Sequence, residues 1–184
     1  MDFSARTYHR AWNAEAYLAQ YYSRVEPTER FTMRFLHDAI QDLPANARAL
    51  DFGAGPTLHH AITLAGRARE IHVADLLPQN LHALRRWHRG EVDAHDWSAF
   101  LRAALELEGS TSSVSDVQRR EARVRARITG IFACDASRRA PLARDASARY
   151  DCVTSFFCAD SATSDIGEWM RYVRNICSLL APGG

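Results

Sequence analysis

Apolar residues along the chain fall into two patterns, short unbroken runs and longer stretches in which they recur every three or four positions. Short runs bounded by turn residues are typical of buried strands, and the wider spacing is typical of helices with one buried face. The runs predict strands over residues 48–52, 70–75, 128–134 and 150–157. The wider spacing predicts helices over residues 8–24, 27–43, 57–65, 97–107, 114–127 and 166–180, and one that starts at Pro78.

Strands that alternate with helices predict parallel pairing through right-handed crossovers. The expected fold class is therefore α/β, with an open, doubly wound and mostly parallel sheet. The carboxyl ends of such strands share one edge of the sheet, and ligands bind outside that edge. Four segments that directly follow strands should meet there, namely residues 53–57, Asp75, Asp135 and residues 156–160.

The same pattern divides the chain into an N-terminal helical cap over residues 1–46 and an α/β domain over residues 47–184. Residues 181–184, Ala-Pro-Gly-Gly, form a turn signal of the kind that leads into another strand. The fourth strand would also be an uncovered edge strand with Phe156 and Phe157, which is an aggregation hazard. We therefore expect this chain to be a truncated piece of a longer domain whose last strands are missing.

Composition narrows the chemistry. The 184 residues are 47% hydrophobic and 24% charged, as in an ordinary globular domain. All 23 basic residues are arginine, which excludes Schiff-base and P-loop chemistry because both need a lysine amine. The formal net charge of +1 provides no field that would recruit nucleic acid or an anionic membrane, and no apolar run is long enough for a membrane span. We expect neither of those partners.

Cysteine, histidine and arginine patterns suggest no further site. The four cysteines form no C-x-x-C pair, so we expect buried thiols in a reducing cytoplasm and no metal. The eight histidines lack a metal-binding spacing and should lie mostly on the surface or behind a site. Glu121 interrupts the arginines of residues 119–127, which favours a solvated helix face over an RNA-binding surface.

The glycine turn after the first strand is the most informative segment. Gly53 and Gly55 allow close approach of the backbone to a ligand, and the helix that should start near Thr57 offers N–H groups to an anion. Asp75 follows the second strand at about the distance at which the dinucleotide fingerprint places a ribose-binding acid. Leu58 stands where that fingerprint needs its third glycine, so a nicotinamide oxidoreductase is the weaker interpretation.

Asp135 adds a third polar group at the same edge. An acid at the end of the third strand could accept a hydrogen bond from an adenine amino group. Any one strand-end acid is as easily a helix cap or a loop residue. The glycine turn, a ribose acid and an adenine acid in this order favour S-adenosyl-L-methionine as the cofactor.

Eight stretches of sequence then occur in order along nearly the whole chain, at residues 17–22, 50–57, 75–81, 87, 96–97, 107–109, 134–135 and 178–184. Together they resemble the small-molecule N-methyltransferases that act on nicotinamide, phenylethanolamine, and indole or thioether amines. The resemblance implies a Rossmann-like class I S-adenosylmethionine-dependent methyltransferase in which N-terminal helices cap the cofactor.

The resemblance also implies a set of cofactor-binding residues. In chain order these are Tyr17 and Tyr22 from the capping helix, Gly53, Gly55 and Thr57 around the methionine moiety, Asp75 and Asn80 on the ribose, Asp135 and Ala136 beside the adenine, and Phe156 with Phe157 as a floor between cofactor and substrate.

The sequence departs from this family in two respects. Family members commonly carry aromatic residues at the positions of His59 and Leu76, so the packing around the cofactor should differ here. The family's substrate lid and amine-contacting acid lie beyond the Pro-Gly-Gly turn, so the resemblance does not imply the substrate.

We expect in-line methyl transfer to a small-molecule amine or pyridine-type nitrogen. That reaction needs positioning and exclusion of water, with no metal and no obligate acid or base, and Tyr17 and Phe157 are the positioning candidates. The alternative is a non-catalytic nucleoside-binding or scaffolding remnant of the same family. The methyl acceptor stays open, including whether it is nitrogen. We also expect a cytoplasmic monomer.

Overall fold

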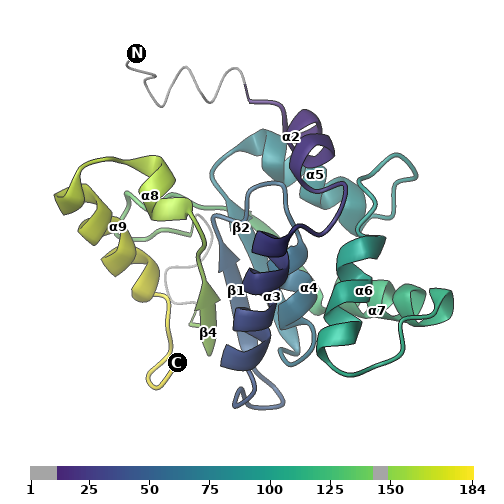
Figure 1. Cartoon of the computed structure of the whole chain (residues 1–184). Coiled ribbons are helices and arrows are strands. Elements are labelled where there is room, and N and C mark those ends of the chain that lie inside the picture. Colours follow the sequence, from purple (N-terminus) through teal and green to yellow (C-terminus); the bar gives the residue numbers. More distant parts are fainter. Residues whose placement is uncertain (1–11, 143–148) are drawn as a thin grey trace.

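A computed structural model describes residues 12–142 and 149–184 (Figure 1). Its sheet has four parallel strands in the order β3-β2-β1-β4. The strands are β1 (Arg48–Phe52), β2 (Glu70–Asp75), β3 (Ile128–Ala133) and β4 (Cys152–Thr154). The helices are α2 (Ala14–Tyr21), α3 (Pro27–Ala39), α4 (His59–Leu64), α5 (Pro78–His88), α6 (Ser98–Leu107), α7 (Val114–Arg127), α8 (Cys158–Ala162) and α9 (Ile166–Cys177).

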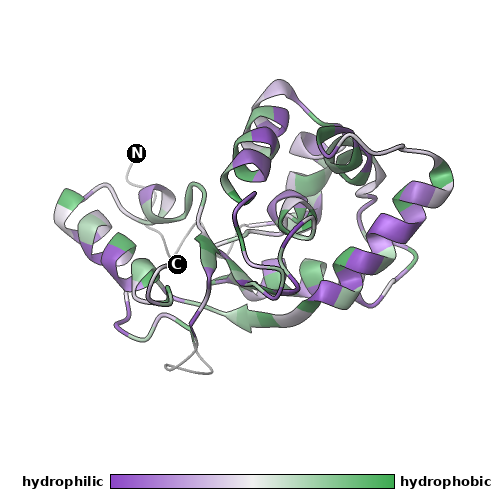
Figure 2. Cartoon of the chain, turned by 90° about the horizontal axis from the view of Figure 1, so that it is seen from below, coloured by the Kyte–Doolittle hydropathy of each residue, from purple (hydrophilic) through white to green (hydrophobic). Residues whose placement is uncertain are grey.

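Helices cover both faces of the sheet, which confirms the doubly wound arrangement (Figure 1). Side chains of a strand alternate between its two faces. In β1, Ala49 belongs to the core formed with α3 to α7, whereas Leu50 and Phe52 belong to the core formed with α9. Figure 2 shows hydrophilic and hydrophobic residues alternating along the helices, as expected for helices with one buried face.

β1 is central and β4 is an edge strand. β1 pairs with β2 from Arg48 opposite Glu70 to Phe52 opposite Ala74. β4 pairs with β1 alone, through the three residues Cys152–Thr154. The expectation that the fourth strand lies at the edge is confirmed.

Several element boundaries differ from the prediction. The predicted fourth strand extended to Phe157, but β4 ends at Thr154, and Phe157 itself has the left-handed φ of 55°, which an extended strand does not accommodate. The short helix after the glycine turn begins at His59, two residues later than predicted. Residues 8–11 of the first predicted helix lie outside the described residues.

The apolar residues of α3 differ in burial. Met33 and Leu36 are buried, whereas Phe31 and Phe35 are 71% and 57% exposed. The helix also ends at Ala39, so Leu43 lies beyond it. Helical spacing was therefore correct for this segment, but it did not identify which apolar residues face the core.

Two predictions about polar and thiol side chains are wrong. Arg120 was expected on a solvated face, but it is buried and its guanidinium pairs with Glu108 and donates to the Ile62 carbonyl at 3.0 Å. Cys177 was expected to be buried and is exposed. Within residues 12–142 and 149–184, no helix combines the length and the apolar character that crossing a bilayer requires.

Candidate cofactor-binding site

The four segments that follow the strands meet at the carboxyl edge of the sheet, as predicted. Backbone pairing places the ends of β1, β2 and β3 side by side, and β4 ends beside β1. Both α2 and α8 lie at this same end of the sheet (Figure 1). Residues from the cap and from four strand ends therefore surround one region.

The glycine turn has the left-handed backbone that glycine accommodates, and its N–H groups are already engaged. Gly53 and Gly55 have positive φ angles of 72° and 64°. The amides of Gly53 and Ala54 donate to the Ala74 carbonyl at 2.8 and 3.0 Å, and the Gly55 amide donates to Asp75 Oδ2 at 2.8 Å. The amide of Thr57 donates to the Ala54 carbonyl at 3.3 Å.

This arrangement corrects the expectation of free amides at the turn. α4 begins only at His59 and has six residues, so Thr57 does not open a helix that could bind an anion. The end of β2 holds the turn in place, because the N–H groups of the turn donate to Ala74 and Asp75.

Asp75 lies at the centre of this network. Besides the Gly55 amide, its carboxylate accepts from the Leu77 amide at 2.8 Å and from Asn80 Nδ2 at 2.9 Å. Burial raises the pKa of Asp75 above its ordinary value, although these hydrogen bonds act in the opposite direction. A carboxylate offers about four acceptor positions, so three protein donors leave roughly one for a ligand.

Asn80 connects Asp75 to the cap. Its Oδ1 accepts a hydrogen bond of 2.6 Å from Trp12 Nε1, while its Nδ2 donates to Asp75. Trp12 was not among the predicted site residues, and a single tryptophan before the first helix gave no pattern that would have identified it.

Asp135 turns its carboxylate toward its own loop. It accepts from the Ser137 amide at 3.0 Å, from Ser137 Oγ at 2.6 Å and from Arg138 Nε at 3.0 Å. Partial burial raises the pKa of Asp135, but the bonds from Ser137 and Arg138 outweigh burial and the pKa is lowered overall. Ala136 is buried, and its carbonyl accepts from Asn175 Nδ2 at 2.8 Å.

The aromatic residues of the cap form a cluster over the turn. The rings of Tyr17 and Tyr22 lie 5.6 Å apart, and Tyr22 lies 5.2 Å from the His59 ring. Burial, followed by the nearby Tyr17, raises the pKa of Tyr22 above its ordinary value, so its hydroxyl keeps its proton at neutral pH. Tyr21 is 52% exposed and lies outside the buried part of this cluster.

The two phenylalanines after β4 have different environments. Phe156 is half-buried and stacks on the His60 ring at 4.2 Å. Phe157 is 68% exposed and is the residue before α8.

Asp51, His59 and His60 form a buried polar group beside the turn that the sequence interpretation did not assign. Their exposed fractions are 1%, 5% and 6%, so His59 and His60 lie behind the site and not on the surface, which is one of the two placements expected for the histidines. Burial and the adjacent His60 hold the pKa of His59 well below its ordinary value, which keeps His59 neutral. The available signal was Asp51 itself, an acid within an otherwise apolar buried strand.

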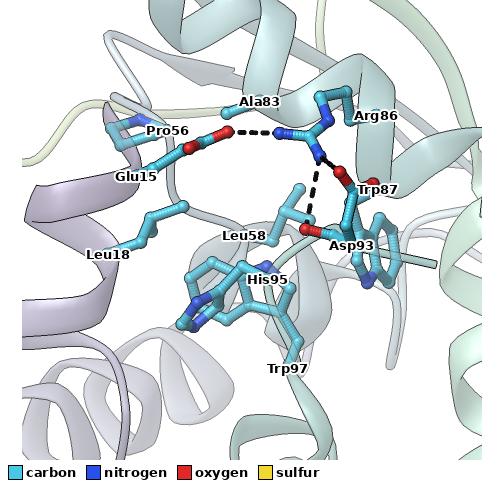
Figure 3. A pocket seen from close by; sticks show the side chains of 10 residues that line it. All are labelled: Glu15, Leu18, Pro56, Leu58, Ala83, Arg86, Trp87, Asp93, His95 and Trp97. Carbon is cyan, nitrogen blue, oxygen red and sulfur yellow. Dashed lines mark hydrogen bonds and ion pairs between the residues drawn. The ribbon is translucent and has the colours of Figure 1, made fainter. Parts of the chain in front are cut away.

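A cavity of about 210 Å³ lies next to this region, between α2, α5 and the loop at residues 91–97 (Figure 3). Its apolar walls include Leu18 and Trp97, and Arg86 at its rim pairs with Glu15 of α2 and with Asp93. The cavity adjoins the glycine turn, because Pro56 and Leu58 line it, whereas Tyr17, Asp75 and Asp135 do not. Among the described residues, no group of three or more His, Cys, Asp or Glu side chains could hold a metal ion.

Comparisons with known proteins agree with this fold. Residues 2–184 match the model of the NNMT/PNMT/TEMT family. The chain is 32% identical over 184 residues to indolethylamine N-methyltransferase from Mus musculus, which covers 96% of this chain and 69% of that protein. It is 30% identical over 188 residues to nicotinamide N-methyltransferase from Homo sapiens, covering 98% and 70%.

Two further relatives match over a smaller share of their own length. Phenylethanolamine N-methyltransferase from Bos taurus is 32% identical over 137 residues, which is 73% of this chain and 47% of that protein. A solved structure of an amino pentose methyltransferase from Micromonospora echinaspora, with S-adenosylmethionine bound, has a TM-score of 0.54 at 21% identity and covers 94% of this chain and 54% of that one. The predicted Rossmann-like methyltransferase fold is confirmed.

Proposed function

Because the chain belongs to the NNMT/PNMT/TEMT family of S-adenosylmethionine-dependent N-methyltransferases, we propose that it transfers a methyl group to a nitrogen atom of a small-molecule amine. The relatives named above act, by their names, on indolethylamine, nicotinamide and phenylethanolamine. The observation that supports this function is the meeting of the cap with four strand ends at one edge of the sheet.

The residues at that edge have properties that suit the cofactor. Asp75 and Asn80 are buried and already hydrogen-bonded, so their orientation toward ribose hydroxyls would be fixed before binding. At Gly55 no atom lies within 4 Å of the position of an added Cβ, so the backbone there is open to a ligand, whereas at Gly53 that space is occupied by the Cys158 side chain. The unpartnered polar atoms of Asp51 and His59 lie beside this turn, where an amino acid group could satisfy them.

The proposed roles follow the order of the strands. Tyr17 and Tyr22 would cover the cofactor, with Gly53, Gly55 and Thr57 along its methionine end, Asp75 and Asn80 on its ribose, Asp135 and Ala136 at its adenine, and Phe156 with Phe157 between it and the acceptor. In this proposal residues 1–46 are the cap and residues 47–184 carry the cofactor-binding domain. The monomeric state and the cytoplasmic location stay predictions.

Methyl transfer of this kind is an in-line displacement. When bound, S-adenosylmethionine supplies a methyl carbon made electrophilic by its positive sulfur. A nitrogen lone pair forms the new C–N bond while the S–C bond breaks, and a primary or secondary amine afterwards loses a proton to water. The protein positions the two reactants and excludes water from them. The tyrosine rings of α2 would attract the positive charge of the sulfur.

The test is direct binding followed by an activity panel. Isothermal titration calorimetry of the protein with S-adenosylhomocysteine should show one site, and NAD under the same conditions should show none. Methyl transfer from radiolabelled S-adenosylmethionine is then measured on nicotinamide, phenylethanolamine and tryptamine. Absence of S-adenosylhomocysteine binding would refute the proposal, whereas binding without transfer to any amine would point to the non-catalytic alternative.

A further inference from the structure

The strongest unexplained feature is a concentration of unpartnered polar atoms on three neighbouring residues. Within the described part of the chain, seven buried side-chain nitrogen or oxygen atoms have no hydrogen-bond partner. Four of them belong to Asp51, His59 and His60, and both ring nitrogens of His60 are among these. Leaving such atoms unpaired costs folding free energy, so their presence at one place calls for an explanation.

The His60 ring contacts two others, since it stacks on the Phe156 ring and is tilted by 45° to the His59 ring. Its centroid is 3.9 Å from that of His59 and 4.2 Å from that of Phe156, and the His60 and Phe156 planes differ by only 25°. The stack runs from the start of α4 to the loop after β4. His60 is therefore the contact through which α4 supports the Phe156 ring.

Asp51 contacts the end of β4, just before the same loop. Its Oδ1 accepts a hydrogen bond of 2.9 Å from Thr154 Oγ1, and the same oxygen lies 3.6 Å from His60 Nδ1. Thr154 is the last residue of β4 and Phe156 follows two positions later. Asp51 and His60 therefore fix both ends of the short segment that leads to the left-handed Phe157.

We propose that His60 is a positioning residue, whose imidazole, supported by Asp51 and His59, fixes the Phe156 ring at the place where methyl donor and acceptor would meet. This inference rests on the proposed function, because only that function gives Phe156 its place between the two reactants. His60 itself does not touch the reacting atoms. It acts by setting the direction of the segment Thr154–Phe157.

The long Asp51–His60 separation fits this role. At 3.6 Å the two atoms are just beyond hydrogen-bond distance, and contacts in an active site often shorten only when the ligand is bound. Groups near Asp51 are the half-buried Tyr22 just after α2, the buried Thr154 of β4 and the half-buried Cys158 of α8. Burial first, and then the charges of Asp75, Asp160 and Asp51, raise the pKa of the Cys158 thiol to about 11.

Nuclear magnetic resonance of histidine-labelled protein tests the geometry without any need for activity. We expect the His60 ring protons to show an upfield ring-current shift that disappears in Phe156→Leu. Addition of S-adenosylhomocysteine should produce a solvent-protected His60 N–H signal, and Asp51→Asn should abolish it. His82→Ala, at an exposed histidine of α5, is the matched control for the assignments.

Kinetics then separate positioning from a merely structural role. With the best acceptor from the amine panel, His60→Ala should lower kcat by about tenfold, since small misplacements of reacting groups are costly, and leave KM for the methyl donor within about twofold. His60→Phe keeps a stacking ring and should restore most of kcat. If His60→Ala does not fold, the comparison uses His60→Phe, which keeps the stacking contact, and Phe156→Leu, which removes it.

The outcomes distinguish this inference from the proposed function. Failure of the wild-type protein to bind S-adenosylhomocysteine refutes the function, whereas the ring-current signature is measured in the ligand-free protein. An unshifted His60 signal, or a His60→Ala variant with unchanged kcat, overturns the positioning role. Loss of kcat in His60→Ala without recovery in His60→Phe also overturns it, because stacking would then not be what His60 contributes.

Discussion

Gly53 is a position at which both backbone conformation and neighbouring atoms restrict substitution. It has a positive φ of 72°, and the Cβ of any other residue would collide with the side chain of Cys158. Gly90 provides a matched comparison, since its φ is 74° and no atom lies within 4 Å of an added Cβ. An alanine would be strained by the positive φ at either position, and only at Gly53 would it also collide with a neighbouring side chain.

We therefore predict that Gly53→Ala lowers the free energy of unfolding by about 2–4 kcal/mol, the sum of left-handed strain and overpacking. Gly90→Ala should lower it by about 1–2 kcal/mol. Urea denaturation followed by circular dichroism measures both. Equal losses in the two variants would show that α8 moves away from the turn at little cost.

Asp75 and Asp135 should respond to pH in opposite directions. Burial raises the pKa of Asp75, so the folded state holds the proton more tightly than the unfolded state does, and this group favours folding at low pH. The pKa of Asp135 is lowered overall, because bonds from Ser137 and Arg138 outweigh burial, so this group favours folding at higher pH. The stability contribution of Asp75 is lost as pH rises through its raised pKa, and that of Asp135 is lost as pH falls through its lowered pKa.

The measurement is the free energy of unfolding of Asp75→Asn and Asp135→Asn between pH 3 and pH 7, each relative to the wild-type protein. As pH rises, the free energy of unfolding of Asp75→Asn should increase relative to that of the wild type, and that of Asp135→Asn should decrease relative to it. Parallel curves for the two variants would contradict the assigned environments.

α2 is attached to the rest of the protein by polar contacts as well as by apolar packing. Trp12, just before the helix, donates to Asn80, and Glu15 in its first turn pairs with Arg86 of α5. The side chain of Glu15 is 72% exposed, whereas that of Arg86 is 14% exposed. Exposed ion pairs contribute little, so the Trp12–Asn80 bond should be the contact that couples the cap to Asp75.

Trp12→Phe should accordingly weaken S-adenosylhomocysteine binding by about twofold to tenfold, the equivalent of one hydrogen bond. Glu15→Gln, one turn away, should change it by less than about twofold. Calorimetry on the two variants decides the point. A larger loss for Glu15→Gln would assign the coupling to the Arg86 cluster instead.

Individual elements show what the sequence could and could not predict. The bounds of β1, β2 and α7 were predicted to the residue, because a buried run or a capped amphipathic stretch with clear turn residues defines each of them. β4 was predicted too long because its end depends on the left-handed Phe157, which no apolar pattern reveals.

The candidate site shows the same division. Strand order made the convergence of the turn with Asp75 and Asp135 predictable from parallel topology. The hydrogen bonds that occupy the turn amides, and the burial of His59 and His60, arise from tertiary packing between segments far apart in the sequence. Local spacing carries no signal for such contacts.

The sheet is held more strongly at β1 and β2 than at its β4 edge. The central pair β1 and β2 is covered by the core that includes α3 to α7, whereas β4 is held by three residues at the edge. The candidate site includes residues from both parts of the sheet, since the glycine turn follows β1 and Phe156 follows β4. A ligand that contacts both parts should therefore stabilise β4 and the segment after it against local opening.

Hydrogen–deuterium exchange with mass spectrometry tests this coupling. In the free protein, amides of Cys152–Thr154 should exchange faster than those of Arg48–Phe52, because β4 has a partner on one side only and opens at lower cost. Saturating S-adenosylhomocysteine should slow exchange together in peptides covering residues 14–22, 53–57, 75–80 and 152–158. Peptides from α7 serve as the internal control and should not change. Protection confined to one of these four segments would contradict a single ligand that joins them.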